Sequence, residues 1–109
     1  MPKYLTLFSF KGEAMAALIE NPSNREEAVR KLAESIGGSL EAYYLMFGQY
    51  DGCVIYDAPD SASAAVTVVA VTSSGAFSRL ETHELMTADQ FLEILSRAKS
   101  ITSYKPPGS

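Results

Sequence analysis

Hydrophobic residues alternate along four segments of the chain, and a period of two is typical of β-strands. Residues 3–10 (Lys-Tyr-Leu-Thr-Leu-Phe-Ser-Phe) are the first such segment, residues 39–47 the second and residues 76–85 the last. Residues 53–56 predict a further strand, which follows residues 39–47 after a tight turn between Gly48 and Gly52. Glycine tolerates the backbone conformations that such turns require. The chain is therefore expected to present Tyr50 and Asp51 at a hairpin tip, where polar side chains can meet a ligand.

A period of three to four residues predicts helices before this hairpin. Residues 13–20 form a short helix, which Asn21-Pro22 breaks. Residues 24–36 form a longer helix that starts at a predicted capping box of Ser23 and Glu26. Glycines 37 and 38 end it, because glycine adopts the left-handed conformation that follows many helices.

Two further helices are predicted in the second half of the chain. Residues 60–72 contain valines, which favour a strand, and alanines, which favour a helix. The length of the segment and Asp60 as an N-cap decide for the helix. A capping box of Thr87 and Gln90 begins the last helix. Its apolar face comprises Phe91, Leu92, Ile94, Leu95 and Ala98.

The order β-α-β-β-α-β-α predicts an α+β fold of the ferredoxin-like type, with a broken first helix and an added C-terminal helix. Helices should cover one face of its antiparallel sheet. The strands nevertheless carry apolar side chains on both faces: Leu5 and Leu7 alternate with Tyr4 and Phe8. A second subunit is therefore expected on the open face, which would make a homodimeric α/β barrel or a higher oligomer. Residues 1–101 form the predicted domain and residues 102–109 a flexible tail.

Composition and charge narrow the classes of partner. The net charge of −4 disfavours nucleic acid, which needs a basic surface. The longest apolar run, residues 64–71, is too short to span a bilayer, so no membrane-spanning segment is expected. Residues 1–4 lead straight into a strand, so no signal peptide is expected. The single cysteine, Cys53, favours the cytoplasm. Metal-ligand spacing is lacking, so neither metal nor cofactor is predicted.

Several short blocks occur at a characteristic spacing. They are Asn21-Pro22 with Arg25, Gly37-Gly38, Tyr44, Gly48-Gln49-Tyr50-Asp51, Ala58-Pro59-Asp60, Gly75 and Arg79-Leu80-Glu81-Thr82. From about Tyr4 to Leu95 the chain thus resembles the GYD-domain family, named for its Gly-Tyr-Asp turn, within the dimeric α/β-barrel superfamily. It differs in Leu80, where the family usually has a smaller polar residue. The resemblance implies the fold but no particular activity, because the superfamily includes monooxygenases, dehydratases, isomerases, stress-induced small barrels and ligand-binding regulators.

The last predicted strand carries the main candidate site. Phe77, Arg79, Glu81 and His83 share one face by the period of two. Arg79 can hold a carboxylate or enolate oxygen, and His83 can move a proton near neutral pH. These residues are predicted to face a barrel cavity that holds an anionic or enolisable small molecule. The alternative is that Arg79 and Glu81 form a structural ion pair while His83 stays solvated.

Tyr50 and Asp51 complete the candidate ligand-binding set, with the alternative that Asp51 only accepts backbone N–H groups to fix the turn. Cys53 lies in an apolar strand and is interpreted as a small buried hydrophobe rather than a nucleophile. Two functions follow. The protein either binds a small molecule, as an enzyme or a sensor, or it is an interaction module whose open sheet face holds subunits together. The sequence does not decide whether it is an enzyme.

Overall fold

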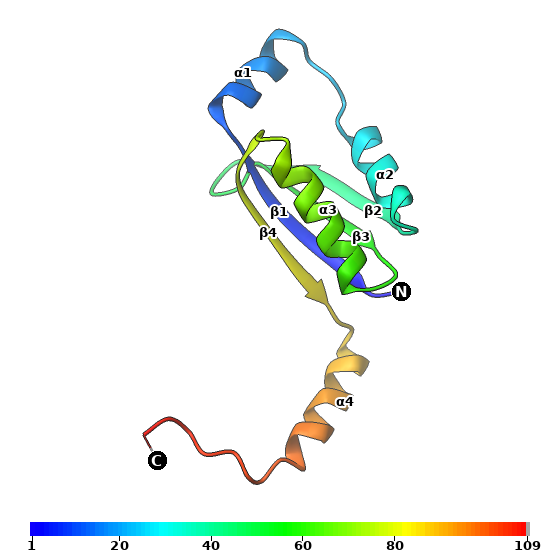
Figure 1. Ribbon diagram of the computed structural model, residues 1–109, viewed down its shortest axis with the longest axis vertical. Coiled ribbons are helices and arrows are strands. Elements are labelled where there is room, and N and C mark those ends of the chain that lie inside the picture. The colour runs from blue at the N-terminus through cyan, green and yellow to red at the C-terminus, as the bar shows by residue number, and fades with distance from the viewer. Residues whose placement is uncertain (109) are drawn as a thin grey trace.

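The computed structural model describes residues 1–108, and it has the predicted order of elements (Figure 1). The four strands are β1 (Lys3–Phe10), β2 (Ser39–Leu45), β3 (Gly52–Asp57) and β4 (Phe77–Leu85). The helices are α1 (Gly12–Glu20), α2 (Glu26–Ser35), α3 (Ser61–Ser73) and α4 (Ala88–Lys99). The strands form one antiparallel sheet in the order β2-β3-β1-β4, so the predicted α+β, ferredoxin-like fold is confirmed.

Helices α2 and α3 cover one face of this sheet, and the other face is open (Figure 1). The buried core lies on the helix side, where Tyr4 and Phe8 of β1 meet Val54 and Tyr56 of β3. Alternate residues of the same strands, such as Leu5, point to the open face and are only half-buried. The period of two therefore assigns both faces correctly in the two central strands.

Two local predictions about helix starts have different outcomes. The Asp60 side chain accepts the Ser63 N–H at 2.8 Å and caps α3, as expected. The capping box predicted at Ser23 and Glu26 is wrong. Asn24 Oδ1 accepts the Glu26 N–H at 2.9 Å instead, and α2 begins at Glu26. Asparagine and serine are equally good at this task, so the local pattern could not separate them.

Gly52 owes its presence to packing rather than to backbone freedom. Gly48 has a φ of +132°, as the turn requires, but Gly52 does not lie in the left-handed region. The ring of Phe8 rests on Gly52, so that a Cβ there would lie 2.3 Å from Phe8 Cζ. Because Gly52 has no side chain, the Phe8 ring can pack directly against the backbone of β3.

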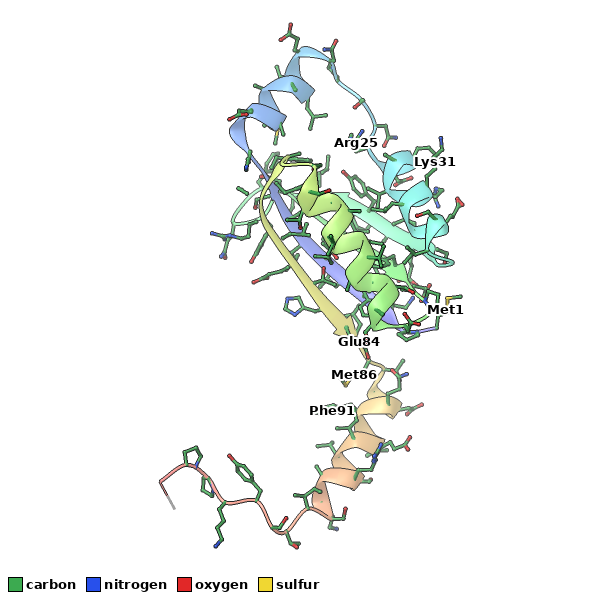
Figure 2. All side chains as sticks on the ribbon, viewed as in Figure 1. Met1, Arg25, Lys31, Glu84, Met86 and Phe91 are labelled. Atoms are coloured by element: carbon green, nitrogen blue, oxygen red, sulfur yellow. The ribbon has the colours of Figure 1, made fainter. Side chains whose placement is uncertain are left out.

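Helix α4 leaves the sheet after Leu85 and runs away from the rest of the chain (Figure 1). It makes no substantial contact with any other element within residues 1–108. Its apolar face is consequently exposed, including Phe91, which Figure 2 shows beyond the end of the sheet. Across residues 1–108, none of the helices combines the length and the hydropathy needed to cross a bilayer.

Candidate functional site

The open face of β4 carries the three predicted polar residues side by side. Arg79 pairs with Ser9, Glu81 with Leu7 and His83 with Leu5, and these β1 partners face away from the helices. The face predicted for Phe77 is wrong. Phe10 pairs with Phe77 and Ser9 with Arg79, so Ser78 is an extra residue in a β-bulge. The bulge turns Phe77 to the helix side, where its ring stacks on that of Phe10 at 5.2 Å.

The β2–β3 turn brings Tyr50 to the same place. It lies across the end of β1, where the Asp51 N–H donates to the Phe8 carbonyl at 2.8 Å. The Ser9 hydroxyl donates to the Gln49 carbonyl at 3.1 Å. Because β4 is the next strand beyond β1, these two bonds place Tyr50 next to Arg79.

Asp51 anchors this turn to the first strand. Its carboxylate accepts the backbone N–H of Phe10 at 2.8 Å, across 41 residues of sequence. Asp51 thus accepts a backbone N–H group and fixes the turn, as the structural alternative expects, but the N–H belongs to β1 and not to the turn itself. A carboxylate engaged in this way positions Tyr50, and its own role in ligand binding remains a prediction.

Tyr50, Arg79, Glu81 and His83 form a connected group, which we call the polar row. The Arg79 guanidinium carbon lies 5.5 Å from the centroid of the Tyr50 ring, a cation–π distance. His83 Nε2 lies 3.6 Å from Glu81 Oε2. The Tyr50 hydroxyl, as a hydrogen-bond donor, is the main cause that lowers the pKa of Glu81, and His83 and Arg79 add to it.

The same contact raises the pKa of Tyr50, chiefly because the Glu81 carboxylate favours the protonated phenol. Glu81 therefore stands between Arg79 and His83 along the row and offsets the positive charge of Arg79. An incoming anion competes with Glu81 for Arg79. All three β4 side chains are exposed in the single chain, which keeps these interactions in water.

The turn lies within a family match that covers most of the chain. The model of the GYD domain matches residues 4–95. The chain belongs to the GYD domain family. In this GYD domain the three signature residues have separate tasks: Gly48 allows the turn, Tyr50 joins the polar row and Asp51 fastens the turn to β1.

A curated relative of this GYD domain comes from Thermus thermophilus. It is 25% identical over 89 residues, which cover 82% of this chain and 94% of the relative. The relative is named "Glutamine synthetase and cystathionine beta-lyase binding protein". The name describes a protein that binds enzymes.

The structure also allows a search for a metal site and for cavities. Within residues 1–108, groups of three or more His, Cys, Asp or Glu side chains with metal-binding geometry are absent. A cavity of about 350 Å³ lies on the helix side of the sheet, opposite the polar row. Periodicity gave no signal for it, because its position depends on where two helices sit along the sheet.

Replacing Tyr50 by phenylalanine is expected to raise the pKa of Glu81 toward its ordinary value. The hydroxyl that stabilises the ionised carboxylate is lost, while the ring under Arg79 remains. A carboxylate with a depressed pKa stabilises the fold above its unfolded pKa, and this contribution disappears as the pH falls through the folded value. Carboxyl-detected NMR titration of wild type and Tyr50→Phe measures the shift. Tyr104→Phe, in the C-terminal segment, is the control, and an unchanged Glu81 in Tyr50→Phe contradicts the contact.

Proposed function

We propose that this GYD domain is a protein-interaction module, which self-associates through its open sheet face and binds another protein through α4. The observation that carries the proposal is the apolar face of α4, which makes no substantial contact with the rest of residues 1–108. Phe91, Leu92, Ile94 and Leu95 are between 45% and 63% exposed. A contiguous apolar helix face that the chain itself leaves uncovered is typical of an interaction site.

The sequence supports α4 as a helix before any partner binds. Thr87 and Gln90 form a complete capping box. Asp89 in the first turn and Arg97 and Lys99 in the last turn complement the helix dipole. These features matter because an isolated helix of this length is only marginally stable in water. A preformed helix with one apolar face suits the mode of recognition in which an amphipathic helix fills a groove of its partner.

The open sheet face supports self-association. Leu5, Leu7, Cys53 and Ile55 form a half-buried apolar patch on the two central strands, and Tyr44 beside it is 64% exposed. Pairing this patch with that of a second copy would bury it symmetrically. The polar row on β4 would then border the interface, where Arg79 and Glu81 can pair between subunits.

The Thermus relative supports the choice of partner class, because its name gives it two enzymes as binding partners. We therefore propose an enzyme as the partner of α4, and glutamine synthetase and cystathionine beta-lyase are the first candidates. Under this proposal the GYD domain is itself a non-enzymic adaptor in the cytoplasm.

The test uses the purified glutamine synthetase and cystathionine beta-lyase of the organism that carries this chain. Biolayer interferometry should detect binding of the wild-type domain to at least one of them. The double variant Phe91→Glu/Leu95→Glu should weaken it by at least about thirtyfold, as expected for central interface residues. Ser96→Glu, on the polar side of α4, is the matched control and should bind like wild type. If neither enzyme binds, or if the double variant binds as well as the control, the proposal fails.

The polar row supports a second candidate function, which is binding of an anionic or enolisable small molecule between paired sheets. The supporting observation is that Tyr50, Arg79, Glu81 and His83 converge from two segments of the chain. Arg79 would hold an oxyanion of the ligand and His83 would exchange a proton with it. In this case Arg79→Gln abolishes ligand binding while the assembly stays intact by light scattering. If Arg79→Gln disrupts the assembly instead, the row is an interface and not a ligand site.

A further inference from the structure

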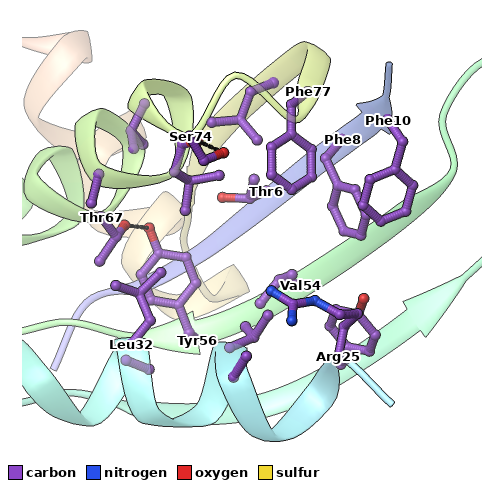
Figure 3. A pocket seen from close by; sticks show the side chains of 18 residues that line it. Thr6, Phe8, Phe10, Arg25, Leu32, Val54, Tyr56, Thr67, Ser74 and Phe77 are labelled. Carbon is purple, nitrogen blue, oxygen red and sulfur yellow. Dashed lines mark hydrogen bonds between the residues drawn. The ribbon is translucent and has the colours of Figure 1, made fainter. Parts of the chain in front are cut away.

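The cavity on the helix side exists because the two covering helices sit over opposite edges of the sheet. Helix α2 packs against β2 and helix α3 against β4, which are the two edge strands. The central strands β1 and β3 form the floor between them (Figure 3). Leu32 from α2 and Val71 from α3 both line the gap of about 350 Å³. This volume lies at the lower end of the range for small-molecule sites, about 300–1,000 Å³.

The interior of the cavity suits an apolar group. The buried hydroxyls along its lining have partners already: Tyr56 bonds Thr67 at 3.3 Å, Thr67 donates to the Ala64 carbonyl at 2.7 Å, and Thr6 bonds Thr82 at 2.8 Å. Among residues 1–108 no buried side-chain polar atom lacks a partner. A polar group brought inside would have to give up its water without gaining a bond, whereas an apolar chain loses nothing.

Arg25 supplies a positive charge at the rim. It precedes α2 directly, and Figure 3 shows its guanidinium turned toward the cavity beside Val54. Arg25 forms no salt bridge within residues 1–108, because the nearby Glu26 and Glu27 pair with Arg30 at 3.2 Å and 3.6 Å. An unpaired guanidinium next to an apolar cavity fits a ligand with a carboxylate at one end.

We propose that the cavity between α2 and α3 binds a small monocarboxylic acid with an apolar body, and that Arg25 binds the carboxylate. A volume of about 350 Å³ suits a small acid with a short apolar body. Medium-chain fatty acids and small aryl-alkyl acids have this size. The site lies on the opposite face of the sheet from the polar row and does not depend on the proposed interaction function.

Octanoate is the probe, and 1-octanol is its neutral counterpart. Isothermal titration calorimetry should show that octanoate binds at one site per chain. The affinity for 1-octanol should be at least about tenfold lower, because 1-octanol cannot form the charge-assisted hydrogen bond. The methyl resonances of Leu32 and Val71 should shift on titration. No binding of octanoate, or equal affinity for the two probes, overturns the proposal.

Variants test which residues contact the carboxylate and which contact the apolar chain of the ligand. Arg25→Gln should weaken octanoate about tenfold and leave 1-octanol unchanged. Lys31→Gln removes the same charge from the outer side of α2 (Figure 2) and should have no effect on either probe. Val71→Phe fills the cavity and should abolish binding of both, with its fold checked by thermal unfolding. Arg79→Gln should leave octanoate binding intact, and a loss there would move the site to the polar row and refute the proposal.

Discussion

Replacing Gly52 by alanine is expected to destabilise the domain by about 3 kcal/mol, at the upper end of the usual cost of overpacking. The added Cβ would lie 2.3 Å from Phe8 Cζ and 2.9 Å from two further ring carbons. Phe8 is only 4% exposed, and its ring is held between Phe10, Tyr43 and Phe77. The ring therefore cannot turn away, and β3 must move from β1. Thermal unfolding followed by circular dichroism should show a melting temperature lower by about 10 °C or more.

Gly12→Ala is the matched control for this prediction. A Cβ at Gly12, the first residue of α1, meets no atom within 4 Å, and alanine favours the helix. Its melting temperature should equal or slightly exceed that of the wild type. A double variant, Gly52→Ala with Phe8→Leu, should be more stable than the sum of its single effects predicts, because the smaller side chain removes the collision. Additive effects in this cycle would contradict the steric explanation.

The fold was predictable because the hydrophobic period and the local stop signals agreed. Both faces of β1 and β3 follow from strict alternation, and the Asp60 cap decided correctly for a helix in a segment of conflicting propensities. The prediction of side-chain faces failed where one extra residue in a strand changes which side chain faces the helices. The bulge at Ser78 inverted the face of Phe77 while leaving Arg79, Glu81 and His83 in phase. A bulge is set by the pairing of two strands, and neither strand shows it alone.

The candidate site was predictable only in part. Period two placed Arg79, Glu81 and His83 together, but their contact with Tyr50 depends on the turn crossing β1, which the bonds of Asp51 and Ser9 fix. Those bonds join residues about forty positions apart, and no local pattern predicts them. The exposure of α4 was also missed. An amphipathic helix has the same sequence pattern whether its apolar face packs on its own sheet or on another protein.

The remaining prediction concerns the open face. If the domain self-associates through this face, as proposed, replacing Ile55 by lysine is expected to convert the dimer into a monomer and to raise the dimer dissociation constant at least about a hundredfold. Ile55 lies at the centre of the open face, between Leu5 of β1 and Ala42 of β2. If a second copy covers this patch, each lysine is buried without a partner, which costs several kcal/mol per lysine. The symmetry of a homodimer applies the cost twice.

Val69→Lys is the control, because it adds the same charge at an exposed apolar position away from the open sheet face. Val69 is an apolar residue, 68% exposed, but it lies on α3, which covers the opposite side of the sheet. Light scattering coupled to gel filtration at micromolar concentration should give a dimer mass for wild type and Val69→Lys and a monomer mass for Ile55→Lys. The folded monomer should keep its circular dichroism spectrum, because Ile55 contributes nothing to the core on the helix side. A wild-type monomer would mean that the sheet face stays open and that the chain does not self-associate. A dimer that tolerates the lysine would mean that another surface holds the two copies together.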